Sequence, residues 1–288
     1  MFSRTEDFLS VVIPVYNEEK IAREFFEKLK GEIQHLCITY EIIAVNDGSH
    51  DHSHEILKSI LDIIVIHNPY NLGYGASLKK GLKAARGNWI LIMDSDGTYP
   101  VEKISDFLEY VNVYDMVVGN RNHKRDALGR KPAKWILKKL ASFLVGRDIP
   151  DLNSGMRVFR RDLALEFFDL YPSGFSFTTT ITIAFFVNDY TIQYIGIPYY
   201  KRVGDSNIRP WHFFDFMALV MKLILYFKPL KMLFIPIISL FSLGVAKAIK
   251  DIITIRSIGN LALILILFSF QILTMALVLK IITKKNLQ

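Results

Sequence analysis

Residues 9–119 alternate between short apolar runs and stretches with helical periodicity. The apolar runs, which predict β-strands, are 9–15, 40–45, 63–67, 89–93 and 115–119. Apolar positions at helical spacing predict helices over 21–31, 54–61 and 77–85. Strands that alternate with helices in this way predict an α/β fold, Rossmann-like, with a mostly parallel sheet.

The pattern changes at Pro132. From there to residue 146, apolar residues share one helical face and lysines share another, which predicts an amphipathic helix lying in a membrane interface. Packing of the same stripe on the folded domain is the alternative. A second helix of this kind is predicted over 211–228.

Two strongly apolar segments follow. Ser257 to Leu279 is a run of 23 residues without a charge, which is enough to span a bilayer. Met232 to Ala246 has 15 uncharged residues and spans only if its flanks are included, so an interfacial or re-entrant segment stays open. The predicted organisation is therefore a domain over 1–210, the interface helix 211–228, and two membrane segments within 229–288, at about 229–248 and 257–280.

Composition supports a chain that is partly in a membrane, since 51% of its 288 residues are hydrophobic. We expect no signal peptide, because the first apolar run is short and contains Pro14. The single cysteine, Cys37, excludes an internal disulfide and fits a reducing compartment. We therefore expect the domain to lie in the cytoplasm.

Charge is concentrated in the middle of the chain. The net charge is +7, but residues 121–161 hold 12 Lys and Arg against three Asp, a balance of +9. Beside membrane segments, such a basic surface indicates membrane lipids or phosphates as partners and no nucleic acid.

Two aspartates, Asp94 and Asp96, follow the apolar run 89–93 and precede a turn that ends at Pro100. Ligands of open α/β sheets bind at the carboxyl ends of the strands. Carboxylate oxygens suit Mg²⁺ or Mn²⁺, so the pair predicts a metal site that also grips a diphosphate. The alternative is a capping role at the helix expected near Val101.

The loops after the first two predicted strands also carry polar side chains, namely Asn17, Glu18, Asp47 and Ser49. Parallel strands would gather them at the same edge as the aspartate pair. The glycine-rich segment 71–76 precedes a helix but matches no known phosphate-binding fingerprint. We interpret it as a close backbone approach, with phosphate contact as the alternative.

Two further polar segments interrupt the apolar second half of the chain. One runs from Asp151 to Arg157, and Asp151 is a candidate either for orienting a substrate or for a structural cap. The other, 199–210, is a basic loop that suits phosphate capture, with attraction to anionic lipid as the alternative.

These residues together resemble the family 2 glycosyltransferases, in the branch of dolichyl-phosphate mannose or glucose synthases and bacterial polyprenyl-phosphate glycosyltransferases. The resemblance covers about residues 10–210 and rests on the segments 12–19, 45–49, 71–73, 94–97, 119–121 and 154–157. It implies a GT-A fold, a nucleotide-sugar donor, Mg²⁺ or Mn²⁺, and an inverting transfer to a lipid phosphate.

Carried over by position, the resemblance implies three groups of site residues. The nucleotide would be held by Pro14, Tyr16, Asn17, Glu18, Asp47 and Asp94. The metal would be held by Asp94 and Asp96, which with Arg121 and Asp151 form the catalytic set. The acceptor phosphate would be held by Arg121, Arg130, Lys134, Arg202, Ser206 and Arg209.

The chain departs from the family pattern at two positions. Thr98 stands where the family often has Gln, which puts a metal contact there in doubt. Asn207 stands where a Lys often follows Ser206, which leaves Arg209 as a replacement cation. The Gln-x-x-Arg-Trp motif of processive polysaccharide synthases is not found, which argues against a polymerising enzyme.

The resulting expectation is transfer of a hexose from a GDP-mannose or UDP-glucose type donor to dolichyl or undecaprenyl phosphate. A lipid phosphate is already anionic, so the site needs cations more than a base. Transfer to a lipid or glycan hydroxyl and a non-catalytic membrane scaffold are the alternatives. Positive residues flanking the apolar segments favour a cytoplasmic catalytic domain only narrowly. The sugar, the nucleobase, the lipid length and a homo-oligomeric state are left open.

Overall fold

The structure of the 288-residue chain is a computed structural model that describes residues 7–121, 139, 141–142, 145–174, 176–201 and 212–285. The chain forms two compact units, Met1–Phe213 and Phe214–Gln288. Most of the predicted interface helix 132–146 lies outside the described residues, as do five predicted acceptor residues, Arg130, Lys134, Arg202, Ser206 and Arg209.

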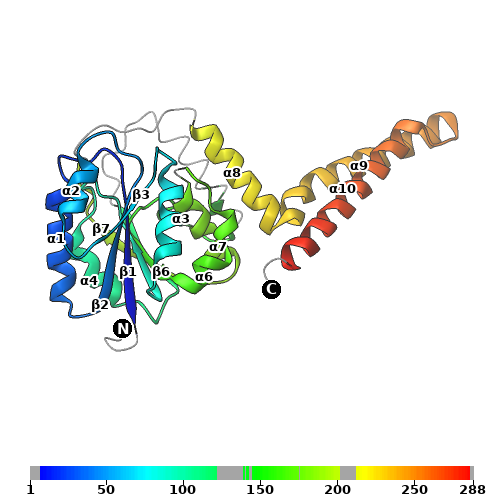
Figure 1. The fold of residues 1–288 in the computed structure, drawn as a ribbon. Coiled ribbons are helices and arrows are strands. Elements are labelled where there is room, and N and C mark those ends of the chain that lie inside the picture. Colours follow the sequence, from blue (N-terminus) through cyan, green and yellow to red (C-terminus); the bar gives the residue numbers. More distant parts are fainter. Residues whose placement is uncertain are drawn as a thin grey trace. The chain divides into compact units, whose positions relative to one another are not determined.

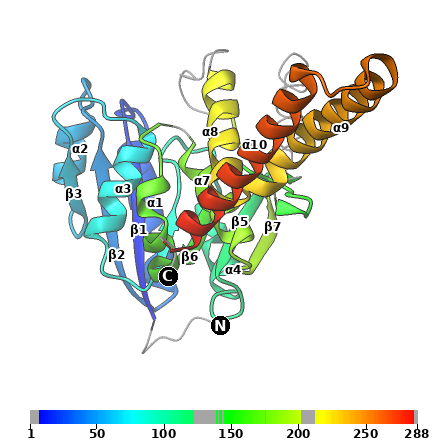
Figure 2. The same cartoon turned by 90° about the vertical axis from the view of Figure 1, so that its right-hand side faces the viewer.

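The first unit is built on a seven-stranded sheet with the order β3-β2-β1-β4-β6-β5-β7. Its strands are β1 Phe8–Val15, β2 Thr39–Asn46, β3 Ile64–His67, β4 Trp89–Ile92, β5 Met116–Arg121, β6 Arg157–Arg160 and β7 Ile192–Ile197. Figure 2 shows them side by side from β3 to β7. Every pairing is parallel except those of β6, which runs antiparallel to both β4 and β5.

The five strands predicted from apolar runs are all present, and the mostly parallel sheet is confirmed. The strands β6 and β7 were not predicted. In β6, only two consecutive apolar residues stand between Arg157 and Arg160, so the apolar stretch is too short and interrupted to predict the strand. Its burial comes from lying between β4 and β5, which a local sequence pattern does not reveal.

Helices cover both faces of the sheet (Figure 1). Those of the first unit are α1 Ala22–His35, α2 Ser53–Ser59, α3 Tyr74–Ala84, η1 Val101–Lys103, α4 Ile104–Leu108, α6 Arg161–Glu166, η3 Phe168–Leu170 and α7 Phe177–Val187. The helices α1 and α4 lie on one face and α3, α6 and α7 on the other. Apolar residues of α1 and α4, including Phe26 and Phe107, form one buried cluster with the strands. This core holds the strand ends in fixed register.

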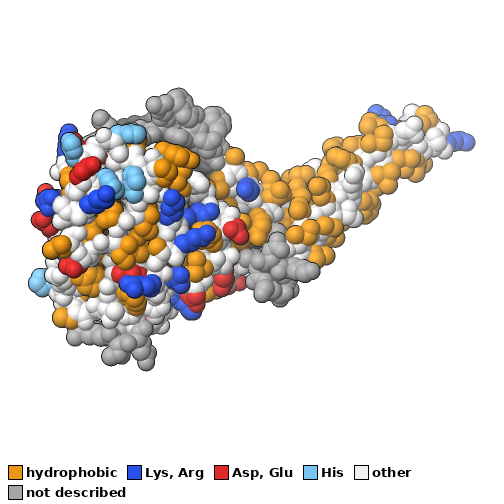
Figure 3. All heavy atoms as spheres, in the orientation of Figure 1, with side chains coloured by type: hydrophobic (Ala, Val, Ile, Leu, Met, Phe, Trp, Pro, Cys, Tyr) orange, Lys and Arg blue, Asp and Glu red, His pale blue; other side chains and the backbone are white. Residues whose placement is uncertain are grey.

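The second unit begins near the start of α8 His212–Phe227 and includes α9 Pro229–Ile255 and α10 Asn260–Lys285. The helix α9 continues through Pro236 for 27 residues, which at 1.5 Å per residue is about 40 Å. It is therefore longer than the predicted segment 229–248. Pro229–Ile255 and Asn260–Ile282 have mean hydropathies of 2.1 and 2.6 and are each long and apolar enough to cross a membrane. Their visible surface is mainly hydrophobic (Figure 3).

The helices α9 and α10 form a hairpin with a close backbone approach. A β-carbon on Gly244 of α9 would lie 2.7 Å from the side chain and 3.1 Å from the backbone nitrogen of Ile266 on α10. At the turn of the hairpin, Asp251 pairs with Lys247 and accepts a hydrogen bond from the Gly259 nitrogen at 3.3 Å. Small residues allow such crossings in membrane helices, where burial of apolar surface supplies little driving force.

We expect Gly244→Leu to destabilise the hairpin by about 1–3 kcal/mol, because the added side chain meets α10. The measurement is the unfolding midpoint of the purified protein in detergent. Ala246→Leu is the matched control, since Ala246 is an exposed position on the same helix. Equal midpoints for the two variants would contradict the close approach.

Candidate active site

The carboxyl ends of β1, β2 and β4 meet at one edge of the sheet. The register pairs Val15 of β1 with Asn46 of β2 and Val12 of β1 with Ile92 of β4. The Ser95 hydroxyl, from the turn after β4, donates a hydrogen bond to the Pro14 carbonyl at 3.0 Å. The loops predicted to converge are therefore brought together.

The two aspartates after β4 are held differently. Asp96 is 7% exposed, and its Oδ1 accepts hydrogen bonds from the backbone nitrogen and the hydroxyl of Thr98, at 3.1 and 2.6 Å. Asp94 is partly exposed, but its Oδ1 is buried. The capping alternative is wrong, because η1 begins after Pro100 and no side chain caps it. Thr98 thus acts on Asp96, whose carboxylate it orients.

The segment before β6 lies directly against Asp94. A β-carbon on Gly155 would be 2.5 Å from Asp94 Oδ2 and 2.8 Å from its Cγ. The Gly155 nitrogen donates to the Tyr99 hydroxyl at 2.6 Å. Burial raises the pKa of Tyr99, so its hydroxyl stays neutral and keeps its proton. The absence of a side chain at residue 155 allows its backbone to lie against the Asp94 carboxylate.

Asp47 organises the loop that precedes α3. Its Oδ1 accepts hydrogen bonds from Asn68 Nδ2 at 2.7 Å and from the Leu72 nitrogen at 2.9 Å. Its Oδ2 accepts one from the Gly73 nitrogen at 2.9 Å. The whole Asp47 residue is 3% exposed. Its role as a nucleotide ligand stays a prediction, but its structural role is clear from these three contacts.

The glycine-rich segment makes the close approach that was predicted. A β-carbon on Gly73 would lie 2.5 Å from the Ser173 carbonyl oxygen, and one on Gly75 would lie 2.1 Å from the Pro172 carbonyl oxygen. Gly73 also has a φ of 101°, which disfavours a side chain. The Gly75 and Ala76 nitrogens donate to the carbonyls of residues 174 and 173. With the Asp47 contacts, four N–H groups of this segment donate within the protein, and phosphate contact by the segment stays a prediction.

The loops after β1 and β2 are hydrogen-bonded to each other. Asn17 has a φ of 55°, its nitrogen donates to Ser49 Oγ at 3.0 Å, and its Oδ1 accepts from the His50 nitrogen at 2.9 Å. The Glu18 nitrogen donates to Ser53 Oγ at 2.9 Å. The Tyr16 ring meets the His50 ring edge-on, with centroids 6.5 Å apart. These contacts lie at the edge of the sheet where the carboxyl ends of β1, β2 and β4 meet, called the strand-end crevice below, where the resemblance places the nucleotide.

Arg121 and Asp151 form a bidentate ion pair. Arg121 Nε donates to Asp151 Oδ2 at 2.7 Å and Nη2 donates to Oδ1 at 2.8 Å, while the Arg121 backbone nitrogen also donates to Oδ2. Burial opposes the charge of Arg121, but the hydrogen bonds and charge of Asp151 outweigh it and raise the pKa of the guanidinium. The guanidinium also lies over the Tyr199 ring at 5.3 Å. Asp151 therefore has a structural role, and any contact of either residue with substrate remains a prediction.

Two residues near the aspartate pair were missed as site residues. Arg157 is 0% exposed and donates to the Ser154 carbonyl, to the Thr178 carbonyl at 2.9 Å and to the Thr182 hydroxyl at 2.8 Å. Burial lowers the pKa of its guanidinium. An arginine within the apolar run Met156–Phe159 was the available signal. Tyr74 was missed because the helix was predicted to start at residue 77, whereas α3 starts at Tyr74.

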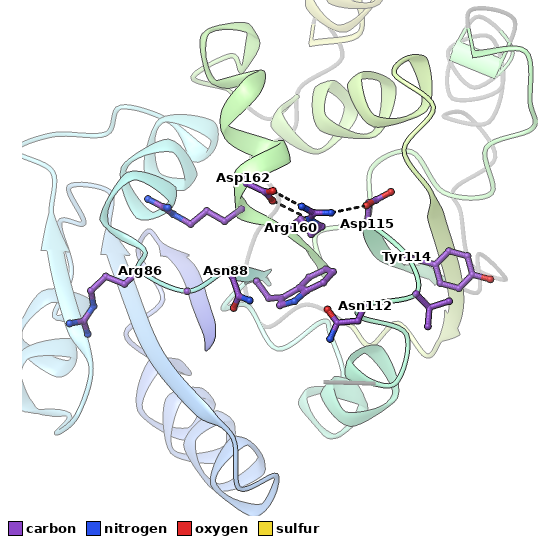
Figure 4. A pocket seen from close by; sticks show the side chains of 11 residues that line it. Arg86, Asn88, Asn112, Tyr114, Asp115, Arg160 and Asp162 are labelled. Carbon is purple, nitrogen blue, oxygen red and sulfur yellow. Dashed lines mark hydrogen bonds and ion pairs between the residues drawn. The ribbon is translucent and has the colours of Figure 1, made fainter. Parts of the chain in front are cut away.

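A cavity of about 560 Å³ lies elsewhere, around Trp89 at the start of β4 (Figure 4). In it, Arg160 is held between Asp162 and Asp115, with nearest contacts of 2.5 and 3.6 Å. Arg86 pairs with Glu41 at 2.9 Å. Both of these arginine charges are paired with carboxylates.

The residues of the crevice fit a divalent metal whose remaining ligands come from substrate. Asp94 and Asp96 supply carboxylate oxygens, the donors that Mg²⁺ and Mn²⁺ prefer. Within the described ranges, no group of three or more His, Cys, Asp and Glu side chains could hold a metal alone. Mg²⁺ is commonly bound by one or two carboxylates together with substrate phosphates.

We expect Asp47→Asn to loosen the loop before α3, because an amide group cannot accept all three hydrogen bonds without facing its own donors. The loss should be about 1.5–3 kcal/mol of stability. Hydrogen exchange at the Leu72 and Gly73 amides should become faster. Asp62→Asn, at an exposed surface pair, should change neither. Unchanged exchange in Asp47→Asn would refute the role assigned to this carboxylate.

Among solved structures, the chain is similar to glucosyl-3-phosphoglycerate synthase from Mycobacterium tuberculosis in complex with Mn²⁺, uridine diphosphate and phosphoglyceric acid. The TM-score is 0.61 at 15% identity, over 77% of this chain and 80% of that one. At this identity the likeness concerns the fold, which is GT-A-like, as predicted.

Among curated proteins, the chain is 29% identical to the dolichyl-phosphate hexose transferase of Haloferax volcanii, over 73% of this chain and 91% of that protein. It is 32% identical to the undecaprenyl-phosphate 4-deoxy-4-formamido-L-arabinose transferase of Photorhabdus laumondii, over 54% of this chain and 50% of that protein. Several other matched relatives are likewise covered over about half their length. Residues 10–168 match the family described as Glycosyl transferase family 2. The chain therefore belongs to glycosyl transferase family 2.

Proposed function

We propose that this protein transfers a hexose, with inversion, from a nucleoside diphosphate sugar to a polyprenyl phosphate at the cytoplasmic face of a membrane. The observation that carries the proposal is the aspartate pair Asp94 and Asp96 at the strand-end crevice. The match to a dolichyl-phosphate hexose transferase over 91% of its length supports the acceptor class.

On the donor side, the proposal assigns the diphosphate and its metal to Asp94 and Asp96. A bound Mg²⁺ or Mn²⁺ would neutralise charge that develops on the departing nucleoside diphosphate. Both carboxylates are held by the protein before any ligand arrives, Asp96 by Thr98 and Asp94 by the Gly155 backbone contact. Preorganised groups of this kind avoid reorganisation during the reaction.

The pairing of Asp151 with Arg121 supports the acceptor class of the proposal. A hydroxyl acceptor must lose a proton as it attacks, whereas a phosphate monoester is already an anion. Asp151 is bound bidentately by Arg121, and an arginine partner makes a carboxylate a weak base. A phosphate acceptor therefore suits this site better than a hydroxyl.

Cations are the second requirement, since donor and acceptor are both negatively charged. The proposal keeps Arg121 in this role through the N–H groups that Asp151 does not engage. It also keeps Arg130, Lys134, Arg202 and Arg209 as cations and Ser206 as a hydroxyl donor to the acceptor phosphate; all five lie outside the described residues. The excess of +9 over residues 121–161 supports the assignment.

The membrane arrangement in the proposal is multi-pass. The helices α9 and α10 would cross the bilayer as a hairpin, and their length and apolar composition support this. A hairpin places the residues before α9 and those after α10 on the same side. Lys228 and Lys231 at the start of α9 and Lys284 at the end of α10 favour the cytoplasmic side for both ends, but only narrowly, because Lys247, Lys250 and Arg256 lie between the two apolar segments.

The test is product formation by the full chain in detergent, with labelled UDP-glucose or GDP-mannose, Mg²⁺ or Mn²⁺, and polyprenyl phosphate. We expect a lipid-linked sugar, and we expect Asp94→Asn and Asp96→Asn to remove it while the melting temperature stays near that of the native chain. Polyprenol without phosphate is the matched acceptor control. Product with polyprenol would favour a hydroxyl acceptor, and no product from any common nucleotide sugar would reject the proposal.

Gly155→Ala should lower the transferase kcat/KM by about 100-fold, because the new methyl group would displace the Asp94 carboxylate. Gly31→Ala is the control, since no other atom lies within 4 Å of a β-carbon placed there. The control should keep full activity. Activity of Gly155→Ala within twofold of the native chain would show that Asp94 tolerates displacement.

A further inference from the structure

Tyr74 is the first residue of α3, and its hydroxyl makes a hydrogen bond with Asp94 in addition to the Gly155 contact. The residue is partly exposed as a whole, but the hydroxyl end of its side chain is buried and hydrogen-bonded to Asp94. A neutral phenol donates to a carboxylate, so Asp94 is the acceptor. No role in substrate binding or catalysis was assigned to Tyr74 above.

The backbone around Tyr74 is held rigidly. Gly73 and Gly75 press against the 172–174 segment so closely that neither could carry a side chain. The Gly75 nitrogen donates to the Gly174 carbonyl at 3.1 Å and the Ala76 nitrogen donates to the Ser173 carbonyl at 2.9 Å. On the other flank, Asp47 binds the Gly73 nitrogen. The Tyr74 side chain therefore projects from a fixed point.

Asp94 is consequently restrained from two directions. The Gly155 backbone packs on the carboxylate, and the Tyr74 hydroxyl donates to it. Its Oδ1 is buried although the residue is partly exposed. A carboxylate that is free to rotate would lose conformational entropy on binding a cation, whereas a restrained one has lost it in folding.

We propose that Tyr74 is a positioning residue that orients the Asp94 carboxylate for the divalent metal and diphosphate, a role that rests on the proposed function. Hydrogen-bond partners of metal-binding carboxylates fix the orientation of those ligands, and removing such a partner typically costs 10- to 100-fold in metal affinity. Tyr74 acts through Asp94 and touches neither the sugar nor the acceptor in this role.

The test uses Tyr74→Phe in the full chain, with Mn²⁺ as the probe in the presence of UDP or GDP. Free Mn²⁺ is measured by its electron paramagnetic resonance signal, so the readout does not depend on turnover. We expect the dissociation constant for Mn²⁺ to rise at least tenfold in Tyr74→Phe. The Mn²⁺ concentration for half-maximal transferase activity should rise in parallel.

Tyr171→Phe is the matched control. Tyr171 is 3% exposed, and its hydroxyl donates to the Ala164 carbonyl at 2.7 Å, away from the aspartate pair. Both variants lose one buried hydroxyl and one hydrogen bond, so their melting temperatures should fall by similar amounts. Only Tyr74→Phe should bind Mn²⁺ more weakly.

The outcomes separate this inference from the proposed function. If the native chain binds Mn²⁺ and Tyr74→Phe binds it equally well, the positioning role is overturned and the proposed function stands. Equal weakening in Tyr171→Phe would also overturn it, because the effect would then be general loss of stability. If the native chain binds no Mn²⁺ with either nucleotide, the metal assignment and the inference fall together.

Discussion

The contact between the Gly155 backbone and the Asp94 carboxylate joins the end of β4 to the start of β6. Asp94 follows the parallel strand β4, while Gly155 leads into β6, the strand that runs against the rest of the sheet. The packing needs a residue without a side chain on one strand end and a carboxylate on the other. The N–H of Gly155 is bound by Tyr99, so the distance between the two ends is fixed from several directions. The shape of the crevice depends on this arrangement.

Beneath this contact, a buried cation holds the Ser154–Gly155 backbone in place. Arg157 directs its guanidinium to the carbonyls of Ser154 and Thr178 and to the Thr182 hydroxyl. Burying a charge is costly unless it is hydrogen-bonded, and these acceptors supply the bonds. They come from the turn before β6 and from α7, so Arg157 links α7 to the Ser154 backbone. The antiparallel strand β6 thus supports the site through Arg157, its first residue.

The aspartates of the crevice divide into two kinds. The carboxylate oxygens of Asp47 and Asp151 accept hydrogen bonds from the protein itself. Those of Asp47 bind the loop before α3, and those of Asp151 bind Arg121. Asp94 and Asp96 are held by neighbouring groups at the strand-end edge where a charged ligand would enter. The first pair orders the protein around this edge, and the proposed function assigns the second pair to the metal and diphosphate.

The sequence by itself determined the alternating strand and helix order, the two apolar C-terminal segments and the aspartate pair at a strand end. These features are local, because apolar periodicity and turn residues report on neighbouring positions in the chain. Only the tertiary structure decided that Asp47 binds the loop before α3 and that Asp151 binds Arg121. It alone brought Tyr74 and Gly155 to Asp94, and Arg157 to α7. Those contacts join residues far apart in the chain, and no local pattern records which distant group a side chain will meet.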